Sequence, residues 1–143
     1  MKRVLFLCTG NYYRSRFAEI LFNHLAREAG IPWVADSCGL RVSADGAVNV
    51  GPISAHVRQG LQERGIALPV ERWPRPVTEA DLAAADIVIA LKEAEHRTLL
   101  EKDFPTQAPR VRYWTVHDLD VCQPAQTLPK LERLVRRLIA ELR

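Results

Sequence analysis

The chain has 143 residues, of which 48% are hydrophobic and 26% are charged, and its formal net charge is +3 with a pI near 9.0. This length and composition predict one globular domain over residues 1–143, with a hydrophobic core of its own. The small positive charge favours an anionic substrate and argues against a nucleic-acid-binding protein, and no apolar run is long enough to cross a membrane.

The cysteines and the N-terminus indicate the compartment. Three unevenly spaced cysteines, Cys8, Cys38 and Cys122, do not form the pattern of a disulfide framework and favour a reducing environment. The apolar run at residues 4–7 is too short for the core of a signal peptide. We therefore expect a cytoplasmic protein that does not associate with a membrane. The histidines show no metal-ligand spacing, so we expect neither a metal ion nor another cofactor.

The first elements of the chain are a strand, a loop and a helix. The apolar residues 4–7 have no polar break and predict a buried strand of a parallel sheet. A helical apolar stripe follows over residues 15–28. The loop between them, from Cys8 to Arg14, contains a thiol, a glycine, an asparagine and a guanidinium. We expect the rest of the chain to serve as a scaffold for this loop.

The residues of this loop are those that a phosphate-transferring nucleophile needs. The helix N-terminus, the free backbone N–H groups and Arg14 all favour the thiolate of Cys8, which is the nucleophilic form. The same groups can bind a tetrahedral dianion, since Gly10 allows close approach and Asn11 tolerates the left-handed conformation. Ser15 is placed to cap the helix and to donate a hydrogen bond to the sulfur. The spacing Cys-x5-Arg is common by chance, but its context favours an active site over a buried structural cysteine, and predicts phosphoryl transfer through a phosphocysteine.

The segment from Val4 to Ser15, with Ala18-Glu19 after it, resembles the phosphate loop of the low-molecular-weight protein tyrosine phosphatases. The resemblance implies a cofactor-free cysteine phosphatase with a four-stranded parallel sheet. It also implies that Ser37 braces the phosphate loop, together with Asn11 and Ser15. The implied phosphate-binding residues are Thr9, Gly10, Asn11, Tyr12, Tyr13, Arg14 and Ser15.

The remaining elements alternate between strands and helices. We expect strands at residues 33–37, 86–91 and 111–114, and helices at 54–64, 93–102 and 130–143. Thr78 and Asp81 resemble a capping box that opens a short helix, and residues 39–52 and 69–76 are expected to be irregular. This alternation predicts a doubly wound α/β sheet with helices on both faces. We expect a fold in three layers, with four strands in the order 2-1-3-4 and the phosphate loop after the first strand.

The chain departs from the family pattern at several positions around the expected site. Residues 39–52, which form one wall of the family's substrate cleft, contain no aromatic residue, and residues 69–76 contain no histidine to order the loop. Leu91-Lys92 follows the third strand where the family has Met-Asp. Tyr13 stands where many relatives have a second cysteine, so we expect that oxidised Cys8 forms no disulfide with its loop neighbour.

A phosphatase of this kind needs one carboxylic acid that protonates the leaving group and then activates water. The loop after the fourth strand is its natural source, and Asp118 falls on the aspartate of the family's Asp-Pro pair. Leu119 replaces the proline, and Asp120 is the alternative acid. Both aspartates also have a purely structural interpretation as turn formers.

We therefore expect a phosphatase that acts on phosphotyrosine or aryl phosphate, in a protein or a small molecule, and that is a monomer. A phosphopeptide-binding module without turnover is the first alternative, favoured by the departures from the family pattern. Arsenate reduction, which occurs on the same fold, is the second. The thioredoxin-coupled reductases need two further cysteines near residues 91–102, and this segment has none, although Cys122 lies on the loop of the acid.

Overall fold

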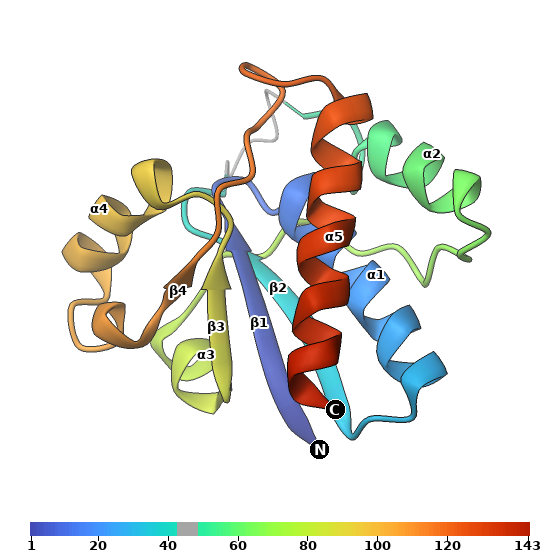
Figure 1. Cartoon of the computed structure of the whole chain (residues 1–143). Helices are drawn as coiled ribbons and strands as arrows, with labels where there is room; N and C mark the ends of the chain where they lie inside the picture. Colours follow the sequence, from blue (N-terminus) through green and yellow to red (C-terminus); the bar gives the residue numbers. More distant parts are fainter. Residues whose placement is uncertain (43–48) are drawn as a thin grey trace.

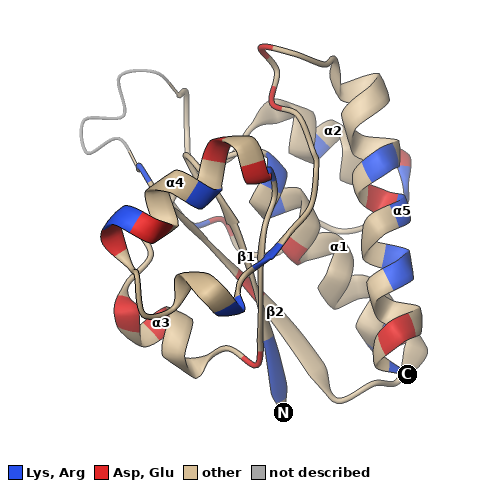
Figure 2. Ribbon diagram, turned by 60° about the vertical axis from the view of Figure 1, so that its left-hand side comes forward, with Lys and Arg blue, Asp and Glu red and all other residues tan. Residues whose placement is uncertain are grey.

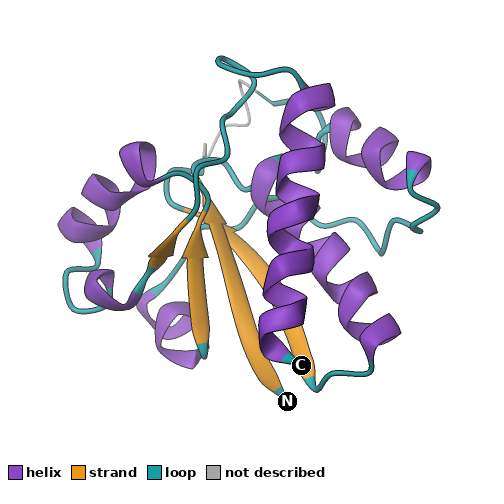
Figure 3. Cartoon of the chain, in the orientation of Figure 1, coloured by secondary structure: helices purple, strands orange, loops and turns teal. Residues whose placement is uncertain are grey.

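A computed structural model describes residues 1–42 and 49–143 of the chain. Four parallel strands form one sheet in the order β2-β1-β3-β4, with helices on both faces (Figures 1 and 3). The predicted fold class and strand order are therefore confirmed. The strands are β1 (Lys2–Cys8), β2 (Trp33–Gly39), β3 (Ile87–Ala90) and β4 (Arg112–Tyr113).

Strand β1 lies in the middle of the sheet and is buried on both faces. Successive side chains of a strand point to opposite faces, so Val4, Phe6 and Cys8 join one hydrophobic cluster while Leu5 and Leu7 join the other. Because each face is covered by helices, the strand is a continuous apolar run rather than an alternating one. Its C-terminal end places Cys8 at the edge of the sheet where ligands of such folds bind.

The two faces are covered by different sets of helices (Figure 1). One face carries α1 (Arg14–Ala29) and α5 (Pro124–Leu142), with α2 (Ala55–Glu63) packed beside α1. The other carries α3 (Glu79–Ala84), α4 (Glu93–Asp103) and the 3-10 turn η1 (Ala108–Arg110). Lys and Arg alternate with Asp and Glu along α4 and α5 (Figure 2), as expected of solvated faces. None of the helices within the described ranges is long and apolar enough to cross a bilayer.

Most helix ends follow their sequence signals. Ser54 caps α2 and accepts a hydrogen bond from the backbone N–H of His56, and Thr78 with Asp81 forms the expected capping box of α3. The expectation that Ser15 caps α1 is wrong. The N-cap is Tyr13, and Ser15 lies within the first turn of the helix, where its hydroxyl is free to face the phosphate loop.

The last helix begins six residues earlier than residue 130, the predicted start, so that prediction is wrong at its N-terminal end. Pro124 occupies the first turn, where a missing N–H costs nothing, whereas Pro129 in the second turn deprives one carbonyl of its helical donor. Thr127 and Leu128, just before Pro129, are buried against the rest of the protein. At the other edge of the sheet, β4 has two residues rather than the four of the predicted strand 111–114, since it pairs with β3 alone.

Candidate active site

The backbone of the Cys8 loop is held from outside by the segment that follows β2. The carbonyl of Cys8 accepts a hydrogen bond of 2.9 Å from the N–H of Leu40, and the carbonyl of Thr9 accepts one of 2.8 Å from the N–H of Arg41. In a planar trans peptide the N–H points opposite to the C=O. The N–H groups of Thr9 and Gly10 are therefore directed away from this segment, toward the inner side of the loop.

The second half of the loop is held in the same way by α1 and by the start of α2. The carbonyl of Tyr12 accepts from the N–H of Ser54 at 3.1 Å, and that of Tyr13 accepts from the N–H of Phe17 at 3.0 Å. Carbonyls that point outward leave amide hydrogens pointing inward, which is the arrangement that binds an oxyanion. The loop amides are thus arranged as the hypothesis of an anion site at this loop requires.

The glycine at the end of β2 makes this close approach possible, and the sequence analysis did not single it out. A Cβ atom on Gly39 would lie 2.9 Å from the carbonyl oxygen of Thr9 and 3.1 Å from the Cβ atom of Asn11. Gly39 pairs with Cys8 in the sheet, so a side chain here would push the loop away from β2. Glycine at a strand end next to a catalytic loop is the sequence signal for such an approach.

Three polar side chains lie behind the buried thiol of Cys8. The Oγ atom of Ser15 lies 2.9 Å from the sulfur, and the side-chain amide of Asn11 donates to Ser15 at 2.8 Å and to Ser37 at 2.9 Å. Because Ser15 accepts from Asn11, its own hydrogen is free for the sulfur. Asn11 has a φ of +50°, in the left-handed region. The structure brings together the predicted supporting residues Asn11, Ser15 and Ser37.

The side chain of Arg72 takes the place of the histidine that the segment 69–76 lacks. It donates to the Oδ1 atom of Asn11 at 3.0 Å, to the hydroxyl of Ser37 at 2.9 Å and to Glu19 at 2.9 Å. The backbone N–H of Arg75 also donates to Asn11. The sequence did not reveal this role, because one arginine in an arginine-rich chain carries no distinguishing signal.

The guanidinium of Arg14 is buried and fully oriented. It donates to the carbonyl of Val116 at 3.1 Å and to both carboxylate oxygens of Glu95, at 2.7 and 3.3 Å. Burial alone lowers the pKa of Arg14, but the hydrogen bond with Glu95 and the nearby negative charges raise it above its ordinary value. Arg14 is therefore a fixed positive charge beside the sulfur.

Glu95, on α4, is a site residue that the sequence analysis missed. Its carboxylate also accepts from the hydroxyl of Thr9 and lies 3.0 Å from Nε2 of the buried His96, whose Nδ1 accepts from the N–H of Lys92. Burial raises the pKa of Glu95, but the hydrogen bonds from His96, Arg14 and Thr9 outweigh it and lower the pKa well below its usual range. The carboxylate that pairs with Arg14 thus lies one helical turn beyond Lys92. The family pattern instead has an aspartate at position 92.

The two candidate acids lie on the loop after β4, at the mouth of a cavity of about 200 Å³ above the sulfur. The Oδ2 atom of Asp118 lies 3.4 Å from Nη2 of Arg14, and its Oδ1 atom accepts from the N–H of Leu119. Among the described contacts, Asp120 has none with Arg14. The cavity is lined by Cys8, Gly10, Tyr12, Tyr13, Arg14, Asn49, Asp118, Leu119 and Asp120.

The two tyrosines of the loop have different environments. Tyr12 lines the cavity and donates its hydroxyl hydrogen to the carbonyl of Val50, so its ring is fixed at the rim. Tyr13 is buried with its ring edge-on to His56, and burial raises its pKa to about 12. The wall from residue 39 to residue 52 is described only in part, since residues 43–48 lie outside the described residues.

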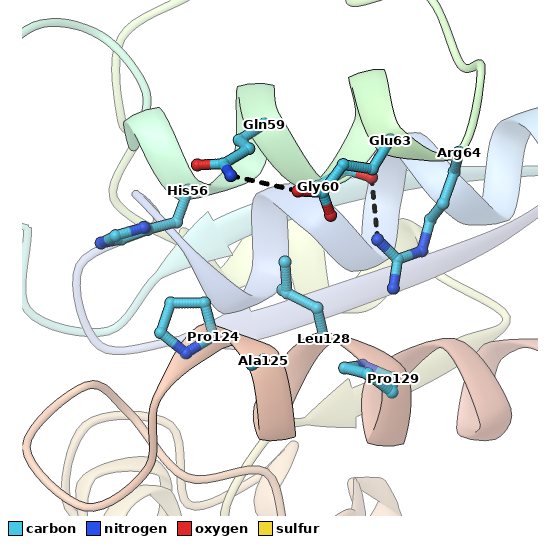
Figure 4. A pocket seen from close by; sticks show the side chains of 9 residues that line it. All are labelled: His56, Gln59, Gly60, Glu63, Arg64, Pro124, Ala125, Leu128 and Pro129. Atoms are coloured by element: carbon cyan, nitrogen blue, oxygen red, sulfur yellow. Dashed lines mark hydrogen bonds between the residues drawn. The ribbon is translucent and has the colours of Figure 1, made fainter.

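A larger cavity, of about 330 Å³, lies between α2 and the start of α5 (Figure 4). Gln59, Glu63 and Arg64, three of its polar side chains, are paired with neighbours. Gln59 donates to Glu63, and Arg64 donates to the carbonyl of Gly60 and to Glu132. No predicted site residue lines it, whereas Cys8, Arg14 and Asp118 line the smaller cavity.

The other two cysteines lie apart from the phosphate loop in the sequence. Cys38 is buried in β2, and burial raises its pKa to about 11, while Cys122 is half-buried on the loop of Asp118. No disulfide is formed. Within residues 1–42 and 49–143 there is no group of three or more His, Cys, Asp or Glu side chains that could hold a metal ion.

Known proteins are similar to this chain in both sequence and fold. The chain is 30% identical to the protein-arginine-phosphatase of Bacillus subtilis over 98% of this chain and 96% of that protein. The crystal structure of the low molecular weight protein tyrosine phosphatase from T. tengcongensis matches with a TM-score of 0.82 and 29% identity, over 99% of this chain and 100% of that one. A cysteine-to-serine mutant of YwlE arginine phosphatase with a phosphorylated active-site serine matches with a TM-score of 0.82 and 26% identity, over 98% and 95% of the two chains.

The family model of the low molecular weight phosphotyrosine protein phosphatases matches residues 3–143, nearly the whole chain. The match includes the loop after β1, where the thiol, the serine hydroxyl, the arginine and the inward-facing amides meet. The chain therefore belongs to the low molecular weight phosphotyrosine protein phosphatase family, whose members are cysteine-based phosphatases.

Proposed function

We propose that Cys8 is the nucleophile, Arg14 the phosphate-binding cation and Asp118 the general acid of a protein phosphatase. The observation that carries this assignment is the position of the Cys8 sulfur, 2.9 Å from the hydroxyl of Ser15, on a loop whose amides face inward beside a fixed guanidinium. Asp118 is preferred to Asp120 because it contacts Arg14, the group that also holds the phosphate.

The reaction has two steps. In the first, the thiolate of Cys8 attacks phosphorus, the bond from phosphorus to the leaving group breaks, and Asp118 gives its proton to the leaving atom. In the second, Asp118 accepts a proton from water, whose oxygen attacks phosphorus as the bond to sulfur breaks. The hydroxyl of Ser15 stabilises the departing thiolate, and Arg14 with the loop amides stabilises the equatorial oxygens. The phosphorylated serine of the YwlE mutant supports a phosphoenzyme on this fold.

The substrate is a phosphorylated side chain of a protein, with phosphotyrosine or an aryl phosphate as the first candidate. Tyr12 at the rim supports it, because a fixed aromatic ring can stack on an aromatic leaving group. A second candidate, phosphoarginine, is favoured by the two carboxylates, Asp118 and Asp120, that line the same cavity and complement a guanidinium. The Bacillus subtilis relative is named for this activity.

The test measures phenol release from phenyl phosphate by the wild type and by Cys8→Ser, Asp118→Asn and Asp120→Asn from pH 5 to pH 7.5. Turnover without added metal, abolished by Cys8→Ser and reduced at least about tenfold by Asp118→Asn, supports the assignment. An effect of Asp120→Asn alone makes Asp120 the acid. Phosphate binding without turnover in the folded wild type would instead indicate a binding module.

The substrate class is decided by a second comparison. Peptides that differ only in phosphotyrosine or phosphoarginine are offered to the wild type and to Asp120→Asn. If the cavity selects a guanidinium, the variant loses activity on the phosphoarginine peptide and keeps it on the phosphotyrosine peptide.

We further propose that residues 1–143 act as one cytoplasmic domain and as a monomer. The single sheet with one covering layer on each face supports the first point. Three free cysteines, one of them the nucleophile, fit a reducing compartment.

A further inference from the structure

Arg16, two residues beyond the phosphate-binding Arg14, is a buried cation. Its side chain is 3% exposed, and its guanidinium donates to three backbone carbonyls: Asn11 at 3.3 Å, Pro52 at 2.9 Å and Arg72 at 2.8 Å. In the described part of the chain, no carboxylate forms an ion pair with it. A buried charge without an ion-pair partner is costly, so its place calls for a functional explanation.

We propose that Arg16 is a positioning residue that holds the Asn11–Tyr12 peptide in the orientation that presents the N–H of Tyr12 to the bound phosphate. The inference rests on the proposed function, since it concerns the phosphate site of that function.

The carbonyls of the Cys8 loop are held by two kinds of donor. Those of Cys8, Thr9, Tyr12 and Tyr13 accept hydrogen bonds from backbone N–H groups, which do not depend on the side chain of the donor residue. The carbonyl of Asn11 is held by a side chain, that of Arg16. Because the peptide is planar and trans, fixing this carbonyl outward fixes the N–H of Tyr12 inward. The orientation of one amide of the anion site therefore depends on one side chain.

The Asn11–Tyr12 peptide also follows a residue with a less favourable backbone conformation. Asn11 has a φ of +50°, a conformation that is less favourable for residues other than glycine. The side chain of Asn11 is fixed by Arg72, and the backbone carbonyl of Arg72 is in turn bound by Arg16. Arg16 thus ties the loop, the segment at Pro52 and the segment at Arg72 into one unit.

The positive charge of Arg16 also favours an anion in the Cys8 loop. Burial, and after it the positive charge of Arg72, lowers the pKa of Arg16 to about 10, so the group is still protonated at neutral pH. A thiolate at Cys8 stabilises this cation, and by reciprocity the cation stabilises the thiolate and a phosphate dianion.

The test uses Arg16→Met, which removes the charge and the donors at similar length, and Arg16→Lys, which keeps a charge. Arg27→Met is the matched control, because Arg27 is exposed in the last turn of the same helix. Inorganic phosphate is titrated into each ¹⁵N-labelled protein, and the dissociation constant and the shift of the Tyr12 amide signal are measured.

We expect Arg16→Met to weaken phosphate binding about tenfold or more and to lose most of the Tyr12 amide shift, with Arg16→Lys between it and the wild type. Arg27→Met should stay within about twofold. A folded Arg16→Met that keeps both the wild-type dissociation constant and the wild-type Tyr12 shift overturns the proposal. If Arg16→Met does not fold, Arg16→Lys decides by the same two readouts, because a single ammonium nitrogen cannot take the positions of both Nη1, which holds Asn11 and Pro52, and Nη2, which holds Arg72.

A failure of this proposal can be distinguished from a failure of the proposed function, since phosphate binding is measured without turnover. A wild type that binds phosphate but is inactive leaves this comparison intact. A wild type that does not bind phosphate overturns both. In an active enzyme, Arg16→Met should also raise KM for phenyl phosphate more than it lowers kcat, because the lost amide contacts the phosphate in the bound substrate as well.

Discussion

The carboxylate of Glu95 and the guanidinium of Arg14 form a two-pronged ion pair, with Nη2 of Arg14 2.7 Å from Oε2 and Nη1 3.3 Å from Oε1. The pair joins α4 to the first turn of α1 across the C-terminal edge of the sheet. It fixes the guanidinium from the side, so the group that we propose to bind phosphate is held in one orientation by the protein itself. Such preorganisation is what makes a charge effective in stabilising a transition state.

Replacing this carboxylate by an amide should misplace Arg14. In Glu95→Gln, the NH₂ group cannot accept the hydrogen bonds that Arg14, Thr9 and His96 now donate. We expect kcat/KM for phenyl phosphate to fall at least about tenfold. Glu93→Gln, on the exposed side of the same helix, is the control and should change activity little, because its pair with Arg97 is solvated. Equal losses in both variants would contradict the role of Glu95.

Acid should remove the stabilisation that Glu95 provides. Its pKa in the folded chain lies below the ordinary 4.5, so the contribution to stability is fully present above that value and is lost as the pH falls toward the folded pKa. The difference in urea midpoint between the wild type and Glu95→Gln should therefore be largest at neutral pH and shrink below about pH 4.5. A difference that grows on acidification would show that the sign is wrong.

A methyl group at Gly39 should disturb the phosphate loop. The added Cβ atom would meet the backbone carbonyl of Thr9 at 2.9 Å, and backbone cannot yield as a flexible side chain can. We expect Gly39→Ala to lose most of the phosphate affinity, measured by inhibition of phenyl phosphate hydrolysis. Gly30→Ala is the control: Gly30 has a φ of +66° and open space around it, so the variant should lose about 1 kcal/mol of stability and keep its activity.

Arg72 should be replaceable in part by the residue that the family pattern has in this segment. Arg72→Ala removes the hydrogen bond to Oδ1 of Asn11 and should lower kcat/KM about tenfold. Arg72→His can still donate one hydrogen bond to Asn11, so it should recover part of that loss. The three proteins are compared on phenyl phosphate, and a histidine variant no better than alanine would argue against the bracing role.

Oxidation should leave Cys8 without an intramolecular disulfide to its loop. Tyr13 stands where many relatives have the second cysteine, so the sulfenic acid formed by peroxide has no thiol in the loop to condense with. Peptide mapping of peroxide-treated protein should show Cys8 as an oxyacid or, after addition of glutathione, as a mixed disulfide. An intramolecular disulfide to Cys122 would contradict this expected peptide map and would make Cys122 a resolving thiol.

The features that could be predicted are those with a local signal. The apolar run at residues 4–7 has no polar break because β1 is covered on both faces, and the Cys8–Arg14 spacing followed by Ser15 identified the loop. Topology then placed this loop at the edge of the sheet where the aspartates of the last loop also lie. The candidate site residues were inferred from these signals together.

The partners of these residues could not be predicted in the same way. Glu95, Arg72 and Arg16 are ordinary members of a chain with 20 Lys and Arg and 17 Asp and Glu, and each acts through a contact distant in sequence or through the backbone. Lys92 stands where the family pattern has the aspartate of its Met-Asp pair. Only the fold shows that the carboxylate of Glu95, one helical turn later, faces Arg14. The early start of α5 was hidden by Pro129, whose usual meaning as a helix boundary is outweighed by packing.

The outward-held carbonyls of the Cys8 loop have a consequence for anyone who wishes to transplant it. The residues from Cys8 to Ser15 do not contain the donors that orient their own backbone, which come from Leu40, Arg41 and Ser54. Grafted between another strand and helix, this octapeptide would keep its nucleophile and lose its shape. A transplant that keeps the shape of the loop must also carry β2, the turn after it and the first residues of α2, which is more than a third of the chain.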